Sequence, residues 1–360
     1  MVSSRRLKVA LVGCGDISGR HIGAFGRYSH AATIAVCCDT SIERAQHAAA
    51  EVAKNGDAPR VTQSYQDVLS DPEIDAVDLC LPHHLHAPAA IQAAQAGKHV
   101  LCEKPLALNV EECDAMIAAA EQAGVVLCHG EPMRCAGVVM RAAAMIAEGA
   151  IGRIMGLQAT FAYWQRPELN TGWRGNRHES GGGHLMDGGI HIIDVLRQLG
   201  GEIVAVQAML AHYRPELGAD SEDLALLNLR YAEGHCGQLF ACHATKSRAA
   251  SPLVSVFGDA GSLSVEAFGP GNGLVLFKPG EAPQIQEPDH AWVDGYERLI
   301  GSFIEAATGS GPLLATPQDG RENVRVVLGA YRSAETGTEI TLDTPSRPNQ
   351  GDLSPSDVQE

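Results

Sequence analysis

A glycine-rich turn near the start of the chain has the spacing of a dinucleotide-binding site. An apolar run, 7–12, leads directly into Gly13-Cys-Gly15, and a helix-like pattern follows. Gly13 permits a tight turn, and Gly15 lets the backbone approach a pyrophosphate at the amino terminus of the helix. Ser18 stands where the motif usually has Gly or Ala, and it is small enough for the helix and the strand to pack closely.

Asp39, at the end of the next apolar run, has the second feature of such a site. A carboxylate about 20 residues beyond the turn can accept hydrogen bonds from the ribose hydroxyls. Asp39 alone could equally cap a helix that begins at Ser41, but strand, turn, helix and carboxylate together favour dinucleotide binding. The carboxylate repels a 2′-phosphate, Thr40 and Ser41 carry no charge, and Arg44 compensates only in part. We therefore expect NAD rather than NADP.

Two more segments, 81–86 and 97–105, carry polar residues at the ends of apolar, strand-like runs. In an open α/β sheet, ligands bind at the carboxyl ends of the strands. Together with the turn, these segments complete the set of expected cofactor contacts, which are Gly13, Gly15, Asp16, Ile17, Asp39, Pro82, His83, His86, Glu103 and Lys104.

Asp187 and His191 are four residues apart, so on a helix they share one face. Oxidation of an alcohol by NAD needs a hydride acceptor, a base for the hydroxyl proton, and a donor near the charge that develops on oxygen. A carboxylate and an imidazole suit this chemistry. Taken alone, however, Asp187 could be a helix cap and His191 a structural histidine.

These segments together resemble the glucose–fructose oxidoreductase / inositol dehydrogenase / MocA family. The family shows a glycine-rich turn followed by His, a T-P-N-x-x-H-like loop, a G-K-H-V-x-x-E-K-P run and a later G-G-G-x-x-x-D-x-x-x-H-x-x-D segment. In this chain the last of these spans 181–194. The resemblance covers roughly residues 7–342.

The resemblance implies that Lys104, Asp187 and His191 converge beside the nicotinamide. His191 is then the expected general base, and Asp187 holds a substrate hydroxyl and tunes the histidine. Lys104 hydrogen-bonds the reacting oxygen or its neighbour, and the alternative assignment makes Lys104 the base. Pro105 is a candidate for a cis peptide bond with Lys104, and Asp194 is expected to be structural.

Arg134, Trp173 and Arg174 match family positions, so they join Lys104, Asp187 and His191 as expected substrate contacts. The chain departs from the usual pattern at 83–84 and around 129–135, which leaves the identity of the substrate open. Further polar and aromatic residues suit a small polyhydroxylated ligand, namely Trp164, Asn170 and His178. We expect a dehydrogenase acting on a sugar, glycoside or cyclitol hydroxyl. The alternatives are an NAD-retaining, redox-assisted glycosidase and a ligand-sensing homologue without turnover.

The elements expected to position these residues fall into two groups. Residues 1–128 alternate strands and helices, which predicts a doubly wound Rossmann domain. Residues 129–343 contain successive strands, which predicts an α+β domain with a large, mostly antiparallel open sheet, and 344–360 is expected to be a mobile tail. The first-domain strands are expected at 7–12, 33–38, 76–81, 99–102 and 125–128, with helices at 19–28, 41–54, 64–70, 86–97 and 110–123. The second-domain strands are expected at 153–164, 202–212, 223–231, 236–243, 252–257, 262–266 and 273–278, with helices at 187–198, 291–307 and 317–334.

The composition narrows the class of protein. A net charge of −16 disfavours nucleic acid and anionic membranes as partners, and no apolar run reaches the roughly 18–20 residues that span a bilayer. The amino terminus passes directly into a strand pattern, so a cytoplasmic location is expected. The ten cysteines form no C-x-x-C pair and are expected to be buried thiols, with no metal site. The family resemblance implies a homodimer or homotetramer.

Overall fold

The first part of the chain builds a six-stranded, wholly parallel sheet in the order β3-β2-β1-β4-β5-β6. The computed structural model describes residues 5–166, 172–214, 221–246, 252–267, 273–286 and 293–342. The strands are β1 (Leu7–Val12), β2 (Ala32–Cys38), β3 (Arg60–Thr62), β4 (Ala76–Leu79), β5 (His99–Glu103) and β6 (Leu127–Gly130). This strand order is that of a Rossmann domain, as the sequence predicts.

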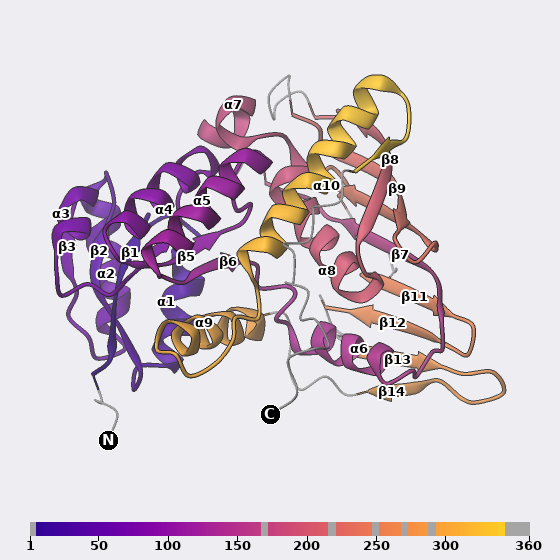
Figure 1. The fold of residues 1–360 in the computed structure, drawn as a ribbon, viewed down its shortest axis with the longest axis horizontal. Helices are drawn as coiled ribbons and strands as arrows, with labels where there is room; N and C mark the ends of the chain where they lie inside the picture. The colour runs from indigo at the N-terminus through magenta and orange to yellow at the C-terminus, as the bar shows by residue number, and fades with distance from the viewer. Residues whose placement is uncertain are drawn as a thin grey trace, which may run out of the picture.

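Helices alternate with these strands and cover both faces of the sheet (Figure 1). They are α1 (Ser18–Arg27), α2 (Ile42–Ala53), α3 (Tyr65–Ser70), α4 (His86–Gln95) and α5 (Val110–Ala123). Most residues of the four central strands, β1, β4, β5 and β6, are buried, because helices cover both faces of the sheet, and Asp78 and Glu103 are buried charged residues among them. β3 was not predicted: it is three residues long and only partly buried, too short to show a hydrophobic period.

The second sheet has nine strands in the order β14-β13-β12-β11-β7-β10-β9-β8-β15. Only the central pair, β7 and β10, is parallel, so the predicted, mostly antiparallel sheet is confirmed. The strands are β7 (Ile154–Ala162), β8 (Ile203–Ala211), β9 (Leu224–Tyr231), β10 (Cys236–Cys242), β11 (Val254–Gly258), β12 (Ser262–Glu266), β13 (Gly273–Phe277), β14 (Gln284–Gln286) and β15 (Ile340–Thr341).

One face of this sheet packs against helices (Figure 1), namely α6 (Gly137–Ala147), α8 (Ile190–Gly200) and α10 (Pro317–Thr336). The opposite face leaves large apolar side chains exposed, among them Met209, Phe257, Phe277 and Ile285. α6 was not predicted, because it begins at a glycine and has no capping side chain to signal its start.

α9 (Val293–Ala307) follows the second sheet along the chain but packs against α1 of the Rossmann domain (Figure 1). Leu299, Ile300 and Phe303 share one apolar core with residues of α1 and β1. The chain therefore returns to its first domain before α10 crosses to the second sheet. The predicted tail, 344–360, lies outside the described residues, as does Asn170.

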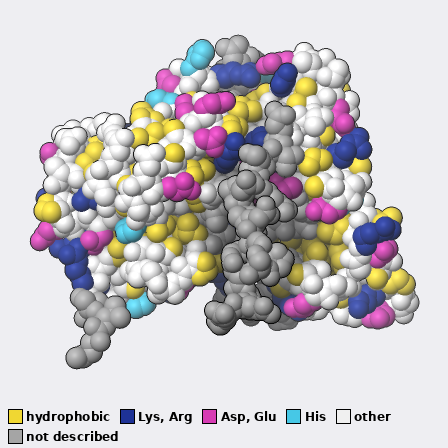
Figure 2. Space-filling view, viewed as in Figure 1, with side chains coloured by type: hydrophobic (Ala, Val, Ile, Leu, Met, Phe, Trp, Pro, Cys, Tyr) yellow, Lys and Arg dark blue, Asp and Glu magenta, His cyan; other side chains and the backbone are white. Residues whose placement is uncertain are grey.

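No described helix is both long and apolar enough to cross a membrane. On the described part of the face in Figure 2, Lys and Arg side chains are interspersed with Asp and Glu and form no basic patch. All ten cysteines are free thiols, and all except Cys236 are buried.

Candidate active site

The glycine-rich turn has the geometry that a dinucleotide requires. Gly13 has a φ of +88°, and a Cβ placed there would collide with the backbone carbonyl of Cys80, just after the neighbouring strand β4. Gly15 is different: a Cβ at this position would meet no atom within 4 Å. The backbone at Gly15 therefore borders open space at the start of α1, where a pyrophosphate can approach it.

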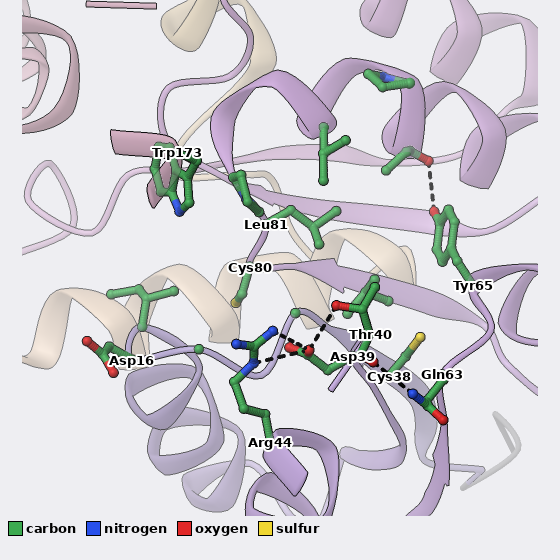
Figure 3. Close-up of a pocket in the computed structure, with 18 of the residues that line it drawn as sticks. Asp16, Cys38, Asp39, Thr40, Arg44, Gln63, Tyr65, Cys80, Leu81 and Trp173 are labelled. Atoms are coloured by element: carbon green, nitrogen blue, oxygen red, sulfur yellow. Dashed lines mark hydrogen bonds and ion pairs between the residues drawn. The ribbon is translucent and has the colours of Figure 1, made fainter. Parts of the chain in front are cut away.

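Asp39 follows β2 and is held as a carboxylate. Its Oδ2 accepts the Cys14 N–H at 2.8 Å, and its Oδ1 accepts the Ser41 N–H at 2.8 Å and Arg44 Nη2 at 2.8 Å. Burial opposes the charge, but these donors hold the pKa of Asp39 below its usual value. Figure 3 shows the guanidinium of Arg44 turned back onto Asp39. We expected Arg44 to compensate in part for the negative charge of Asp39, and it does so through a direct ion pair.

The glycine-rich turn, Asp39 and Arg44 line a cavity of about 530 Å³. Its walls include Gly13, Gly15, Asp16, Ile17, Asp39 and Pro82 from the predicted set, and Tyr65, Gln92, Trp173 and Arg174 besides. The open backbone at the turn and the Asp39 carboxylate beyond it fit an NAD molecule.

Four residues from the predicted cofactor set do not line this cavity. His86 is buried, and its ring nitrogens lie 2.7 Å from the Pro105 carbonyl and 2.9 Å from the Leu81 carbonyl. His83 is also buried, with its Nδ1 2.8 Å from the Ser180 carbonyl. These two side chains support the loop rather than contact the cavity. The other two are Glu103 and Lys104, described below.

A second cavity, of about 540 Å³, brings the three proposed catalytic residues together. Lys104, Asp187 and His191 all line it, although they come from distant parts of the chain. Asp16, Ile17 and Arg174 line this cavity and the cofactor cavity alike, so the two adjoin at the glycine-rich turn. The remaining lining residues are Arg20, Met133, Thr160, Phe161, Ala162, Tyr163, Gln165, Gly188 and Tyr296.

Lys104 follows β5 directly, and its peptide bond to Pro105 is cis, as predicted. Its Nζ lies 3.0 Å from Asp187 Oδ1 and also donates to the Asp187 carbonyl. The ammonium is therefore anchored at the wall of the cavity.

Asp187 lies in a five-residue π-helical turn, Leu185–Gly189, and not in a regular helix; α8 begins only at Ile190. Arg174 Nε and His83 Nε2 lie 3.4 and 3.6 Å from its carboxylate. Burial opposes the charge, but Lys104, His83 and Arg174 hold the pKa of Asp187 well below its usual range. Asp187 is thus an anion among cationic and polar neighbours.

His191 is oriented by a residue that the sequence analysis did not single out. Its Nδ1 lies 2.7 Å and 2.8 Å from the two carboxylate oxygens of Glu131, which is buried in the loop after β6. A carboxylate can only accept, so Nδ1 carries the proton and Nε2 is the basic nitrogen. The expectation that Asp187 tunes the histidine therefore needs correcting: the direct partner is Glu131. Its only signal in the sequence is its place just after a strand end.

The expected substrate contacts divide into two groups. Arg174 lines both cavities, whereas Trp173 lines only the dinucleotide cavity; the guanidinium lies 4.3 Å from the indole centroid, and the indole packs against His83. Arg134 lines neither cavity. Its Nη1 lies 2.8 Å from Asp194 and 3.1 Å from Asp319, in a buried ion-pair network.

The other described residues named from the sequence, His178 and Trp164, line neither cavity. His178 is exposed on α7 (Arg177–Ser180), and Trp164 stacks under the Arg214 guanidinium. Among the described residues, one group has the ligand types of a metal site: His21, Asp78 and Cys80, all buried.

Comparison with known proteins agrees with this architecture. Residues 7–131 match the GFO_IDH_MocA oxidoreductase family with an NAD-binding Rossmann fold, and residues 143–342 match the C-terminal α/β domain of the same family. The chain belongs to this family and is an NAD-dependent oxidoreductase.

Several relatives are named for carbohydrates. A 1,5-anhydro-D-fructose reductase from Ensifer adhaerens is 32% identical over 83% of this chain and 89% of its own length. A D-glucoside 3-dehydrogenase from Escherichia coli is 27% identical over 95% and 99%. The structure of a levoglucosan dehydrogenase in complex with NADH and levoglucosan superposes with a TM-score of 0.84, at 26% identity, over 94% of this chain and all of that one.

Proposed function

We propose that this protein transfers a hydride between NAD and a secondary hydroxyl of a sugar, glycoside or cyclitol, with His191 as the general base. One observation carries the proposal: Lys104, Asp187 and His191 line a single cavity that adjoins the dinucleotide cavity. The names of the relatives support a carbohydrate as the substrate class, since they act on anhydrosugars and glucosides.

Each side chain at the site has a separate role in the proposed hydride transfer. NAD held by the glycine-rich turn and Asp39 would supply the acceptor for the hydride of the carbinol carbon. His191 Nε2 takes the hydroxyl proton, and Glu131 stabilises the imidazolium that forms. Lys104 donates to the reacting oxygen as charge develops there. Asp187 keeps the ammonium in place and accepts from a neighbouring substrate hydroxyl. Because Lys104 is already engaged as a donor, we assign the base to His191.

The site favours a polyhydroxylated ligand because its walls carry many hydrogen-bonding groups. Arg174, Tyr163 and Gln165 line the substrate cavity beside the three proposed catalytic residues. Trp173, near the cavity junction, offers an aromatic surface of the kind that packs against a sugar ring. We include both Trp173 and Arg174 among the proposed substrate contacts, and leave Arg134 out because it is held in its own buried network.

The test is a spectrophotometric screen for NAD reduction by inositols, aldoses, sugar acids, anhydrosugars and glycosides, with NADH oxidation by the corresponding ketones as its reverse. We expect turnover with at least one class, and loss of turnover in His191→Ala with NAD binding intact. Cleavage of a glycoside without net NADH would replace this proposal with a redox-assisted glycosidase. A wild type that binds NAD but is inert across the whole panel would point to a ligand-sensing homologue.

We also propose that the protein assembles as a homodimer or homotetramer through the outer face of the second sheet. Met209 and Ile285 are 69% and 72% exposed there, and Phe257 and Phe277 lie on the same face. Exposed apolar side chains spread over a wide face are typical of an interface. A monomer by light scattering at micromolar concentration would contradict this. The cytoplasmic location expected from the sequence remains part of the proposal.

A further inference from the structure

His21 is a fully buried histidine that the mechanism above does not use. It lies on α1, one turn after the glycine-rich loop. Its Nδ1 lies 2.9 Å from Asp78 Oδ2 on β4, and its Nε2 lies 2.9 Å from Glu103 Oε1, at the carboxyl end of β5. One imidazole thus joins the cofactor-binding helix to two strands of the sheet.

The two carboxylate contacts of His21 indicate that its imidazole ring is protonated. A neutral imidazole has one N–H and can donate only once, whereas an imidazolium donates from both nitrogens. Two carboxylates at 2.9 Å therefore match the protonated form. Burial lowers the pKa of His21, but Asp78 and Cys80 raise it, and the net pKa is well above its usual value. Burial likewise opposes the charge on Glu103, yet His21 keeps the pKa of that carboxyl low.

Glu103 connects this pair to the proposed active site. Its second oxygen, Oε2, accepts the backbone N–H of Lys104 at 3.1 Å. After His21, the next cation that stabilises the Glu103 charge is Lys104 itself. If His21 were lost, the buried carboxylate would attract the Lys104 ammonium, which in the structure is bound to Asp187.

We propose that His21 is a positioning residue for the reaction: it occupies Glu103 and so leaves the Lys104 ammonium on Asp187, beside the substrate. This inference rests on the proposed function, which makes Lys104 the donor to the reacting oxygen. It also explains why His21, Asp78 and Cys80 cluster without acting as metal ligands, since both ring nitrogens already donate to carboxylates.

The central experiment compares His21→Leu with a variant that also removes the unpaired charges, His21→Leu/Asp78→Asn/Glu103→Gln. In His21→Leu we expect kcat to fall about 100-fold, the effect of a displacement near 1 Å at a reacting group. KM for the substrate and Kd for NAD should change by less than about threefold, because Lys104 acts in the transition state. The triple variant should recover at least about tenfold in kcat, because no anion then competes for Lys104.

His99→Leu is the matched control. His99 stands at the opposite end of β5 and accepts one backbone hydrogen bond, from the N–H of Val126. Its loss removes a histidine from the same strand but leaves Glu103 and Lys104 as they are. We expect kcat to stay at the wild-type value. An equal loss of kcat in both single variants would mean that strand stability, and not charge placement, is responsible, and the proposal would be wrong.

A second measurement uses the wild-type protein alone and does not depend on turnover. Nitrogen-15 spectra of histidine-labelled wild type should show the ring in contact with Tyr296 as an imidazolium at pH 7. The titratable groups facing it are Asp78 on β4, Cys80 just after that strand, Glu103 on β5, Cys128 on β6 and Tyr296 on α9. A neutral ring at pH 7 would overturn the proposal.

Lys104→Met and His21→Leu distinguish a failure of the proposed function from a failure of the positioning role of His21. If Lys104→Met keeps the wild-type kcat, the proposed function is wrong at Lys104. If Lys104→Met abolishes turnover while His21→Leu does not lower kcat, only the positioning role of His21 is wrong.

Discussion

His191 Nδ1 lies 2.7 Å from Oε1 of Glu131, a buried carboxylate 60 residues away along the chain. The contact selects one tautomer of the histidine and aligns its ring with the cavity wall. It also supplies the negative charge that a protonated His191 needs during alcohol oxidation. Glu131 is therefore part of the proposed base, although it does not line the substrate cavity.

Glu131→Gln should lower kcat by about 100-fold or more, because the amide can present its N–H₂ to Nδ1 and favour the wrong tautomer. NAD affinity should be unchanged, since Glu131 is remote from the dinucleotide cavity. Steady-state kinetics and NAD titration measure the two effects. A variant with the wild-type kcat would show that the tautomer of His191 does not matter, and would remove His191 from the role of base.

The same carboxylate should make stability depend on pH. Burial raises the pKa of Glu131, but His191, His129 and the Met133 N–H together lower it more, so the folded-state pKa lies below the unfolded value. A group of this kind stabilises the fold above its unfolded pKa, about 4.3, and the contribution is lost as the pH falls through the folded value. The difference in unfolding free energy between wild type and Glu131→Gln should therefore shrink between pH 6 and pH 3. Urea unfolding at these two pH values measures it; an increase would contradict the assignment.

Lys104→Met should lower kcat by about 100- to 1,000-fold, the range for removing one donor to a developing oxyanion. The methionine keeps the length of the side chain but cannot donate to the substrate or to Asp187. Lys104→Arg is the control that preserves the charge, and it should retain more activity than Lys104→Met. If both variants were equally inactive, shape rather than charge would be the property that Lys104 contributes.

Asp39→Ser should shift the cofactor preference toward NADP. The substitution removes the charge that repels a 2′-phosphate and releases Arg44, now paired with Asp39, to bind it. We expect the ratio of kcat/KM for NADP to that for NAD to rise at least about tenfold. Adding Arg44→Ala should cancel most of this gain. A ratio unaffected by Arg44→Ala would show that the guanidinium does not reach the cofactor.

Gly13→Ala should lower the Tm of the protein without cofactor, whereas Gly15→Ala should lower its affinity for NAD. Gly13 has a positive φ, which costs an L-residue about 1–2 kcal/mol, and its Cβ would press on the Cys80 carbonyl. Gly15→Ala meets no protein atom, so it should leave Tm unchanged and weaken NAD binding instead. Thermal unfolding without cofactor and NAD titration test the pair. Full NAD affinity in Gly15→Ala would place the pyrophosphate elsewhere.

The Rossmann domain, its glycine-rich turn and the large second sheet could all be predicted from the order of residues alone. These features depend on local rules: the hydrophobic period of each segment, the conformational freedom of Gly13 and the position of polar residues at strand ends. Short or weakly patterned elements such as β3 and α6 were not predicted, because their residues carry little local signal of a strand or a helix.

The contacts between side chains from distant segments became clear only in the folded protein. Arg134 pairs with Asp194 and Asp319, whereas a match by position suggested the substrate. Glu131 reaches His191, and Glu103 reaches His21, from loops and strand ends that are far apart in the chain. Such contacts depend on how whole strands and helices pack, because a hydrogen bond needs its partners within about 3 Å. The spacing of residues along one segment cannot specify that distance.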